Sequence, residues 1–183
     1  MTTVSIIGKA TDKGFEELIL GKLIKSYRIT YIKNKSLVQA GKGYEITVAD
    51  MQELKSLYIH ECIIIMKNDG VVPTIPLPEK SIIIVNSENV EQLTALKNTG
   101  ATVLTCGVGD KDTLSCSSLT SDSITISLNR EITAFSGRSI LPLEIPVKLK
   151  KSPKMPRDVY YPIAFTALRL ILDDFNSELG GLI

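Results

Sequence analysis

The sequence has only three cysteines and one histidine, and these shortages argue against disulfide frameworks, cysteine metal sites and a recognisable catalytic triad. Cys62, Cys106 and Cys116 are odd in number and widely spaced, which argues against a disulfide framework and a Cys-x-x-Cys metal site. Cys62 and Cys106 lie in apolar runs, so we expect two buried thiols. The histidine, His60, has no serine, cysteine or carboxylate pattern beside it that would indicate a catalytic triad.

The chain also lacks an excess of charge and a long apolar run. Its formal net charge is +1, so we expect no nucleic-acid partner. We interpret the densest basic segment, Lys150–Lys154, as a solvated linker. No apolar run approaches the roughly 18 residues that span a membrane, and the N-terminus has no signal-peptide pattern. We therefore expect a cytoplasmic protein with no membrane partner.

The 183 residues are enough for one domain that buries its own core. Through residue 107, short apolar runs alternate with segments of helical periodicity. Runs such as 63–65 and 82–84 show no two-residue alternation, which is typical of strands covered on both faces. Strands are predicted at 4–7, 29–32, 44–49, 62–66, 81–85 and 101–106, and helices at 15–27, 51–58 and 88–98. This order predicts an α/β fold with a doubly wound, mainly parallel sheet.

The pattern changes after Gly107. Alternating apolar and polar residues at 124–128, 131–135 and 143–149 predict a small antiparallel β extension. A proline-containing linker and a closing helix at about 160–173 follow. We thus predict a single domain made of a core (1–107), an extension (108–150) and a closing segment (151–183). We expect the aromatic residues of the last helix to pack against the sheet or, alternatively, to form a dimer surface; they are Tyr160, Tyr161 and Phe165.

Three segments resemble motifs of the central, ATP-binding domain of Mur ligases. Val85-Asn86-Ser87-Glu88-Asn89 is similar to the V-N-x-D-[DN] motif of that family. Residues 101–107 look like the next strand motif, V-x-T-[FY]-G, and 157–165 like the family's helix start, H-N-V-x-N-A-L-A-A. The order of elements agrees over most of the chain. The resemblance implies the P-loop-type fold of that central domain.

The motifs that carry the family's chemistry are absent. A Mur ligase has G-T-N-G-K-[ST] after its first strand, where backbone N–H groups hold phosphates and a hydroxyl binds Mg²⁺. This sequence has Gly8-Lys9-Ala10-Thr11-Asp12-Lys13-Gly14, which places the carboxylate of Asp12 where a triphosphate would lie. The family's Asp-His pair, its modified lysine and both flanking domains also have no counterpart. The resemblance thus implies a degenerate domain, a pseudoenzyme without metal or cofactor.

Polar residues that follow predicted strands form the candidate ligand site. Ligands of open α/β sheets bind outside the carboxyl ends of the strands. The residues at this edge are Gly8, Lys9, Thr11, Lys13, Gly14, Asp50, Asn68, Asp69 and Asn86. The lysines near a helix N-terminus would bind a small anion. Alternatively, the loop is a relic with solvated lysines, and Asn68-Asp69-Gly70 is an ordinary turn.

These observations leave three functional hypotheses. We favour a non-catalytic Mur-ligase-like binding or scaffold protein, whose partner is another protein or a small anionic ligand. A second hypothesis is an enzyme with a rebuilt site for a phosphorylated or nucleotide substrate. Its anion would bind Lys9, Thr11 and Lys13, and Asp50 or Asp69 would act as acid–base. A third is a subunit of a homo-oligomer. No residue is predicted to be catalytic or to bind a metal.

Overall fold

The computed structural model describes residues 2–78, 80–97, 99–149 and 156–174. The chain consists of two compact units, Met1–Val103 and Leu104–Ile183. Strand β7 (Thr102–Gly107) leads from the first unit into the second. Among the described residues, no helix is long and apolar enough to cross a membrane.

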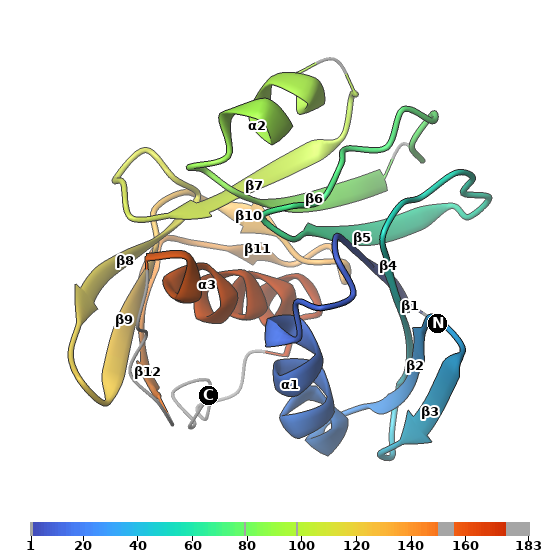
Figure 1. The fold of residues 1–183 in the computed structure, drawn as a ribbon. Helices are drawn as coiled ribbons and strands as arrows, with labels where there is room; N and C mark the ends of the chain where they lie inside the picture. Colours follow the sequence, from blue (N-terminus) through green and yellow to red (C-terminus); the bar gives the residue numbers. More distant parts are fainter. Residues whose placement is uncertain (1, 79, 98, 150–155, 175–183) are drawn as a thin grey trace. The chain divides into compact units, whose positions relative to one another are not determined.

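The first unit is built on a mainly parallel sheet (Figure 1). Its strands are β1 (Thr2–Ile7), β2 (Arg28–Lys33), β3 (Ser36–Ala40), β4 (Glu45–Met51), β5 (Glu61–Met66) and β6 (Lys80–Asn86). They are hydrogen-bonded in the order β6-β5-β1-β4-β2-β3. Every neighbouring pair is parallel except the β2–β3 hairpin. The predicted α/β fold is confirmed.

Helices cover both faces of this sheet. α1 (Gly14–Gly21) and the short η1 (Leu23–Lys25) follow β1, and α2 (Val90–Leu96) follows β6. Figure 1 shows α1 and α2 on opposite sides of the sheet. α1 buries Phe15 and Ile19. These residues are four positions apart and therefore lie on one face, as in an amphipathic helix. The side chain of Asn89 caps α2 by accepting a hydrogen bond from the Gln92 N–H at 3.0 Å.

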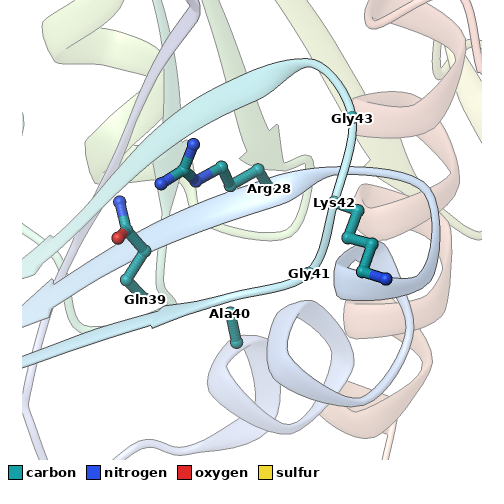
Figure 2. Close-up of a pocket in the computed structure, with 6 residues that line it drawn as sticks. All are labelled: Arg28, Gln39, Ala40, Gly41, Lys42 and Gly43. Atoms are coloured by element: carbon teal, nitrogen blue, oxygen red, sulfur yellow. The ribbon is translucent and has the colours of Figure 1, made fainter.

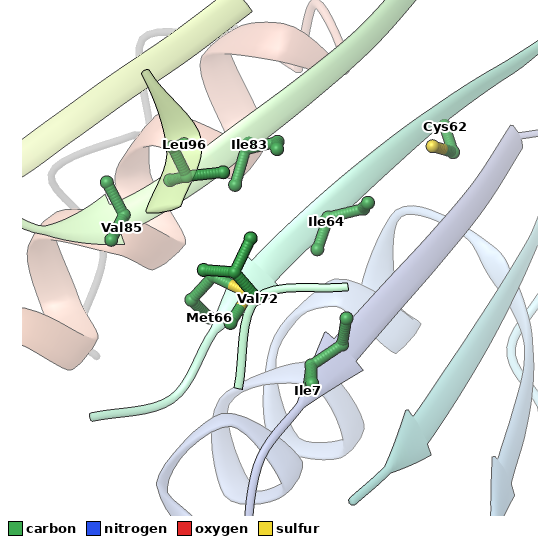
Figure 3. Close-up of a cluster of buried hydrophobic side chains, with 8 residues drawn as sticks. All are labelled: Ile7, Cys62, Ile64, Met66, Val72, Ile83, Val85 and Leu96. Atoms are coloured by element: carbon green, nitrogen blue, oxygen red, sulfur yellow. The ribbon is translucent and has the colours of Figure 1, made fainter. Parts of the chain in front are cut away.

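The core of the first unit extends across the middle of the sheet. In β5, Ile63, Ile64 and Ile65 are all fully buried, because both of their faces are covered. This agrees with the absence of alternation in the sequence. Figure 3 shows the cluster on the α2 side of the sheet, and its members are Ile7, Cys62, Ile64, Met66, Val72, Ile83, Val85 and Leu96. Burial of each large aliphatic side chain contributes about 1.5–3 kcal/mol.

The second unit contains the predicted antiparallel extension and closing helix. Its main strands are hydrogen-bonded in the order β12-β9-β8-β7. The β8–β9 and β9–β12 pairs are antiparallel, whereas β7 and β8 meet in a short parallel contact. Helix α3 packs against β8. The bounds are β8 (Leu114–Leu119), β9 (Ser123–Leu128), β10 (Ile132–Thr133), β11 (Ser139–Ile140), β12 (Leu143–Lys148) and α3 (Pro156–Ile171).

Several parts of the structure differ from the expected elements. Residues 51–58 are not helical: β4 continues to Met51, and an irregular segment leads to β5. Leu54 and Leu57 in this segment pack against the core cluster, which explains why their three-residue spacing resembled that of a helix. The helix predicted for 15–27 ends at Gly21, and the strands β3, β8 and β11 were not predicted. The basic segment Lys150–Lys154 and the tail Gly180–Ile183 lie outside the described residues.

Candidate functional site

A buried lysine lies against the first βα loop, residues 8–14. Lys67 directly follows β5 and has no exposed surface. Its Nζ donates hydrogen bonds to the backbone oxygens of Lys9 and Asp12, both at 3.0 Å, and to Asp50 Oδ1 at 2.8 Å. An ammonium has three N–H donors, and here all three have acceptors. The loop therefore turns backbone carbonyl oxygens toward an internal cation.

Four backbone N–H groups of the same loop donate to the chain's own oxygens. The Lys9 N–H donates to Asp69 Oδ1 at 3.0 Å, and the Gly14 N–H donates to Asp12 Oδ1 at 3.1 Å. The Gly8 N–H donates to the Met51 oxygen at 2.9 Å. Phosphate-binding loops use such N–H groups to hold anionic oxygens. In this loop, two side-chain carboxylates accept from Lys9 and Gly14, and two backbone carbonyls accept from Gly8 and Asp12.

Glycine is required at position 8 by this close approach. The φ angle of Gly8 is +148°, a conformation that residues with a side chain rarely adopt. A Cβ atom at Gly8 would lie 2.5 Å from Lys67 Cβ and 2.7 Å from Asp69 Oδ1. The end of β1 therefore contacts Lys67 and Asp69 directly, with no space for a side chain between them.

Lys67 belongs to a network of buried charges on the face of the sheet that α1 covers. Asp50, 3% exposed, accepts a hydrogen bond from the Tyr31 hydroxyl at 2.9 Å and lies 3.4 Å from Lys33 Nζ. Lys33 in turn donates to Glu16 Oε2 at 2.6 Å. Two lysines thus face two carboxylates, which is the pairing that buried charges require.

The network shifts the pKa values of two of its members. Burial raises the pKa of the Tyr31 phenol above its ordinary value, and the neighbouring Asp50 carboxylate raises it further. For Lys33, burial lowers the pKa, but the hydrogen bond to Glu16 and the charge of Asp50 outweigh burial, so the net shift is upward. Both shifts favour the protonated forms, the Tyr31 phenol and the Lys33 ammonium, which donate the hydrogen bonds to Asp50 and Glu16.

A second polar network joins the start of α2 to the loop 67–70. Asn86 Nδ2 donates to Asn68 Oδ1, and Asn89 Nδ2 donates to the Asn68 backbone oxygen, both at 2.8 Å. Gln92 is buried, and its Nε2 donates to two backbone oxygens of the loop at 2.7 Å each. Buried backbone oxygens need such donors. The side-chain amides therefore hold the loop that carries Lys67 in place.

The structure brings some of the nine predicted residues together and leaves others apart. Lys9 and Asp50 meet through Lys67, whereas Asp69 reaches the loop through the Lys9 N–H. Gly8 and Gly14 belong to the same loop, and Asn68 bonds to Asn86. The side chains of Thr11 and Lys13 are exposed and take no part in these contacts.

Lys67, Tyr31, Lys33, Glu16 and Gln92 are site residues that sequence reasoning missed. A signal for the lysines was present, because Lys67 comes two residues after buried Ile65 and Lys33 two residues after buried Tyr31. Residues two apart on a strand point to the same face. Had the two-residue alternation of buried positions been extended past the last apolar residue of each strand, both lysines would have been predicted to point inward.

The remaining candidates occupy ordinary positions. Cys62 and Cys106 are buried as expected, and burial raises the pKa of both thiols, which disfavours the nucleophilic thiolate. His60 is exposed immediately before β5. Tyr160 and Phe165 are buried within α3, as the packing interpretation predicts. Within the described ranges, no three histidine, cysteine or acidic side chains are grouped to hold a metal.

Comparison with known proteins identifies the fold. No protein-family model and no curated protein matches the sequence. A murein peptide ligase, Mpl, from Psychrobacter arcticus 273-4 matches 92% of this chain with a TM-score of 0.58 at 12% identity. MurF ligase from Thermotoga maritima, in complex with ADP, matches 94% with a TM-score of 0.50 at 13% identity. The chain has a Mur-ligase-like fold.

The predicted resemblance to Mur ligases is therefore confirmed at the level of fold. This chain covers 43% of the Mpl chain and 45% of the MurF chain, less than half of either. A likeness at such low identity concerns the fold, and function has to be argued from the site.

Proposed function

We propose that this chain is a non-catalytic binding or scaffold domain with a Mur-ligase-like fold. The observation that carries the proposal is the position of Lys67, whose ammonium is fully buried and bonded to two oxygens of the first βα loop and to Asp50. Two carboxylates complete the arrangement: Asp69, from the loop 67–70, accepts from the Lys9 N–H, and Asp12 accepts from the Gly14 N–H.

A nucleotide phosphate would meet unfavourable chemistry at this loop. It would have to displace Asp12 and Asp69 from the N–H groups and then lie beside carboxylates of the same sign. The charge of Lys67 offers little compensation, because Asp50 already neutralises it and no part of it is exposed. Of the two exposed ammonium groups of the loop, that of Lys9 lies 3.9 Å from Asp69 Oδ2, which leaves Lys13 for a small anion. Surface charges of this kind bind weakly.

The same contacts argue against an enzyme with a rebuilt site. Asp50 and Lys67 are 3% and 0% exposed, so a substrate reaches neither without movement of the loop. Asp69 already accepts a backbone hydrogen bond. We therefore propose a protein as the partner. The three free thiols fit a reducing compartment, which favours the cytoplasm.

Thermal unfolding with Mg-ATP, Mg-ADP and uridine nucleotides tests the proposal. A ligand that binds only the folded state adds about 2.7 kcal/mol of stability at a hundredfold excess over Kd. We expect no shift of the midpoint with any of these nucleotides and no release of phosphate from ATP. A saturable shift that is lost in the double variant Lys9→Ala, Lys13→Ala would show binding at this loop and overturn the proposal.

A further inference from the structure

The positive charges of this chain are unevenly distributed. Residues 18–44 contain no aspartate or glutamate but six basic residues, Lys22, Lys25, Arg28, Lys33, Lys35 and Lys42. Because the whole chain carries a formal net charge of only +1, the rest of it is net negative. The basic segment comprises the end of α1, η1 and the β2–β3 hairpin.

This hairpin ends in an open strand edge. β3 is the last strand on its side of the sheet and pairs only with β2 among the described residues. Such an edge presents unpaired backbone N–H and C=O groups. The side chains of Leu37 and Val38, in the middle of β3, are 66% and 42% exposed. The edge therefore offers backbone hydrogen bonds and apolar contacts together.

Basic side chains flank the open edge. Lys35 precedes β3 and Lys42 follows it, and both are exposed. Neither forms an ion pair in the described part of the chain, whereas Arg28 is paired with Glu45 at 3.2 Å. Lys33 does not contribute to this surface, because Glu16 and Asp50 hold it inside.

A polar pocket lies at the end of β3. Its volume is about 400 Å³, and it is lined by Arg28, Gln39, Ala40, Gly41, Lys42 and Gly43. Figure 2 shows the ends of Arg28 and Gln39 close together, with Lys42 extending from the turn on the other side. The turn passes close to the backbone of Tyr27: a Cβ at Gly41 would lie 2.1 Å from the Tyr27 oxygen, so this position requires glycine.

We propose that an extended, acidic segment of a partner protein adds to the open edge of β3 as a further strand. Backbone hydrogen bonds would supply affinity, as in other cases of strand addition. Apolar side chains of the partner would contact Leu37 and Val38, and its carboxylates would lie near Lys35 and Lys42. This inference rests on the proposed binding function and specifies the surface and the partner.

Charge distinguishes this partner from a second copy of the chain. Two β3 edges that paired with each other would bring two basic segments together, and flanking lysines are a common means of preventing such self-pairing. An acidic strand is attracted instead. Nucleic acid would contact the lysines. It would leave the backbone N–H and C=O groups of the β3 edge without partners and the side chains of Leu37 and Val38 without apolar contacts, so a peptide strand fits the surface better.

Binding of a designed peptide to the full chain tests the inference. The probe is fluorescein-labelled Glu-Glu-Val-Thr-Val-Thr-Val-Glu-Glu, in which acidic ends flank a strand-forming centre. We expect saturable binding by fluorescence anisotropy, weakening with salt, and slower amide hydrogen exchange in residues 36–40. A version with lysine in place of glutamate, and one with proline for the central valine, should each bind about tenfold more weakly or worse.

Charge reversal identifies the surface. The double variant Lys35→Glu, Lys42→Glu should lose at least about tenfold in affinity, whereas Lys97→Glu, an exposed lysine at the end of α2, should bind as the native chain does. Absence of saturable peptide binding at millimolar concentration overturns the inference, as does equal binding by the double variant.

Two further outcomes would overturn it in favour of another occupant. One is binding of an oligothymidine or of phosphatidylserine vesicles without binding of the peptide. The other is a dimer, detected by sedimentation, that the double variant dissolves while the peptide does not compete. The result with Mg-ATP is independent of all these outcomes, because Lys35 and Lys42 lie outside the loop 8–14, so failure of the inference and failure of the proposed function can be told apart.

Discussion

At the scale of single residues, Lys67 shows how a charge is kept inside a protein. Its ammonium is shielded from water and depends on one carboxylate and two backbone oxygens. A buried pair of this kind adds little stability compared with well-packed apolar residues, but loss of one partner leaves the other unpaired in a low dielectric. The pair as a whole therefore adds little net stability, but removal of Lys67 alone is expected to be costly.

Replacement of Lys67 by methionine tests this role. The variant Lys67→Met retains most of the side chain's volume but leaves Asp50 with Tyr31 and Lys33 only, and it removes the donor to two loop oxygens. We expect a loss of about 3 kcal/mol in the free energy of unfolding, measured with urea. The exposed control Lys97→Met should change it by less than about 0.5 kcal/mol. A comparable, small effect in both variants would contradict the role assigned to Lys67.

The location of the nine candidate residues could be predicted from the sequence in part. The sequence placed Gly8, Lys9, Asp50 and Asp69 at one edge of the sheet, because the carboxyl ends of parallel strands meet there. It did not reveal that Lys67 contacts the loop, because this contact joins residues 55 and 58 positions apart in the chain. Contacts of that range depend on the register of neighbouring strands, which periodicity does not specify.

At the scale of elements, the short helix α2 depends on its connection to the loop 67–70. Seven residues are too few for a helix that is stable on its own. Gln92 donates from one amide group to two buried oxygens of the loop, and Asn89 both caps the helix and bonds to Asn68. The helix and the loop are therefore expected to lose their order together.

The variant Gln92→Ala tests this coupling. It removes one donor from each of two buried oxygens, but the Lys67 oxygen keeps the Gly70 N–H as a donor, so the main loss falls on the Gly70 oxygen. A buried oxygen left without a donor costs about 1–3 kcal/mol, and less where water enters. We expect a net loss of about 2 kcal/mol in the free energy of unfolding, with faster amide hydrogen exchange in both α2 and the loop. The neighbouring exposed position provides the control Glu91→Ala. Faster exchange confined to α2 would separate the helix from the loop and contradict the coupling.

The elements that sequence reasoning found are those with a strong period or a continuous apolar run. β5 and β6 were predicted because both faces are covered, and the alternation of β9 matches its buried positions. β3 was missed because four of its five residues are exposed and carry no core pattern. The segment 51–58 was mistaken for a helix because its leucines pack on the core from an irregular backbone. Propensity and period do not distinguish these cases without tertiary context.

At the scale of the whole molecule, two charge distributions coexist in the first unit. One is internal and balanced: Lys33 and Lys67 face Glu16 and Asp50. The other is external and unbalanced, in the basic residues of the segment 18–44 other than Lys33. The near-zero net charge of the chain hides both, so a judgement from total charge alone excludes partners that a local surface can still bind.

The internal distribution predicts how stability depends on pH. The folded-state pKa values of Tyr31 and Lys33 are both raised, so the folded chain retains their protons at pH values where the unfolded chain releases them. The stabilisation is complete below the unfolded pKa values, about 10 for tyrosine and 10.4 for lysine, and is lost as pH rises above them. Each such proton contributes a slope of about 1.4 kcal/mol per pH unit.

Urea denaturation between about pH 8 and pH 11.5 provides the measurement. The native chain should lose stability steeply above about pH 10, and Tyr31→Phe should lose it less steeply by about 1.4 kcal/mol per pH unit, because one of the two protons no longer contributes. The control Tyr58→Phe removes a phenol that is 95% exposed and should leave the native slope unchanged. If Tyr31→Phe and Tyr58→Phe gave the same slope, the Tyr31 phenol would titrate alike in the folded and unfolded chains, and the buried network would not hold its proton.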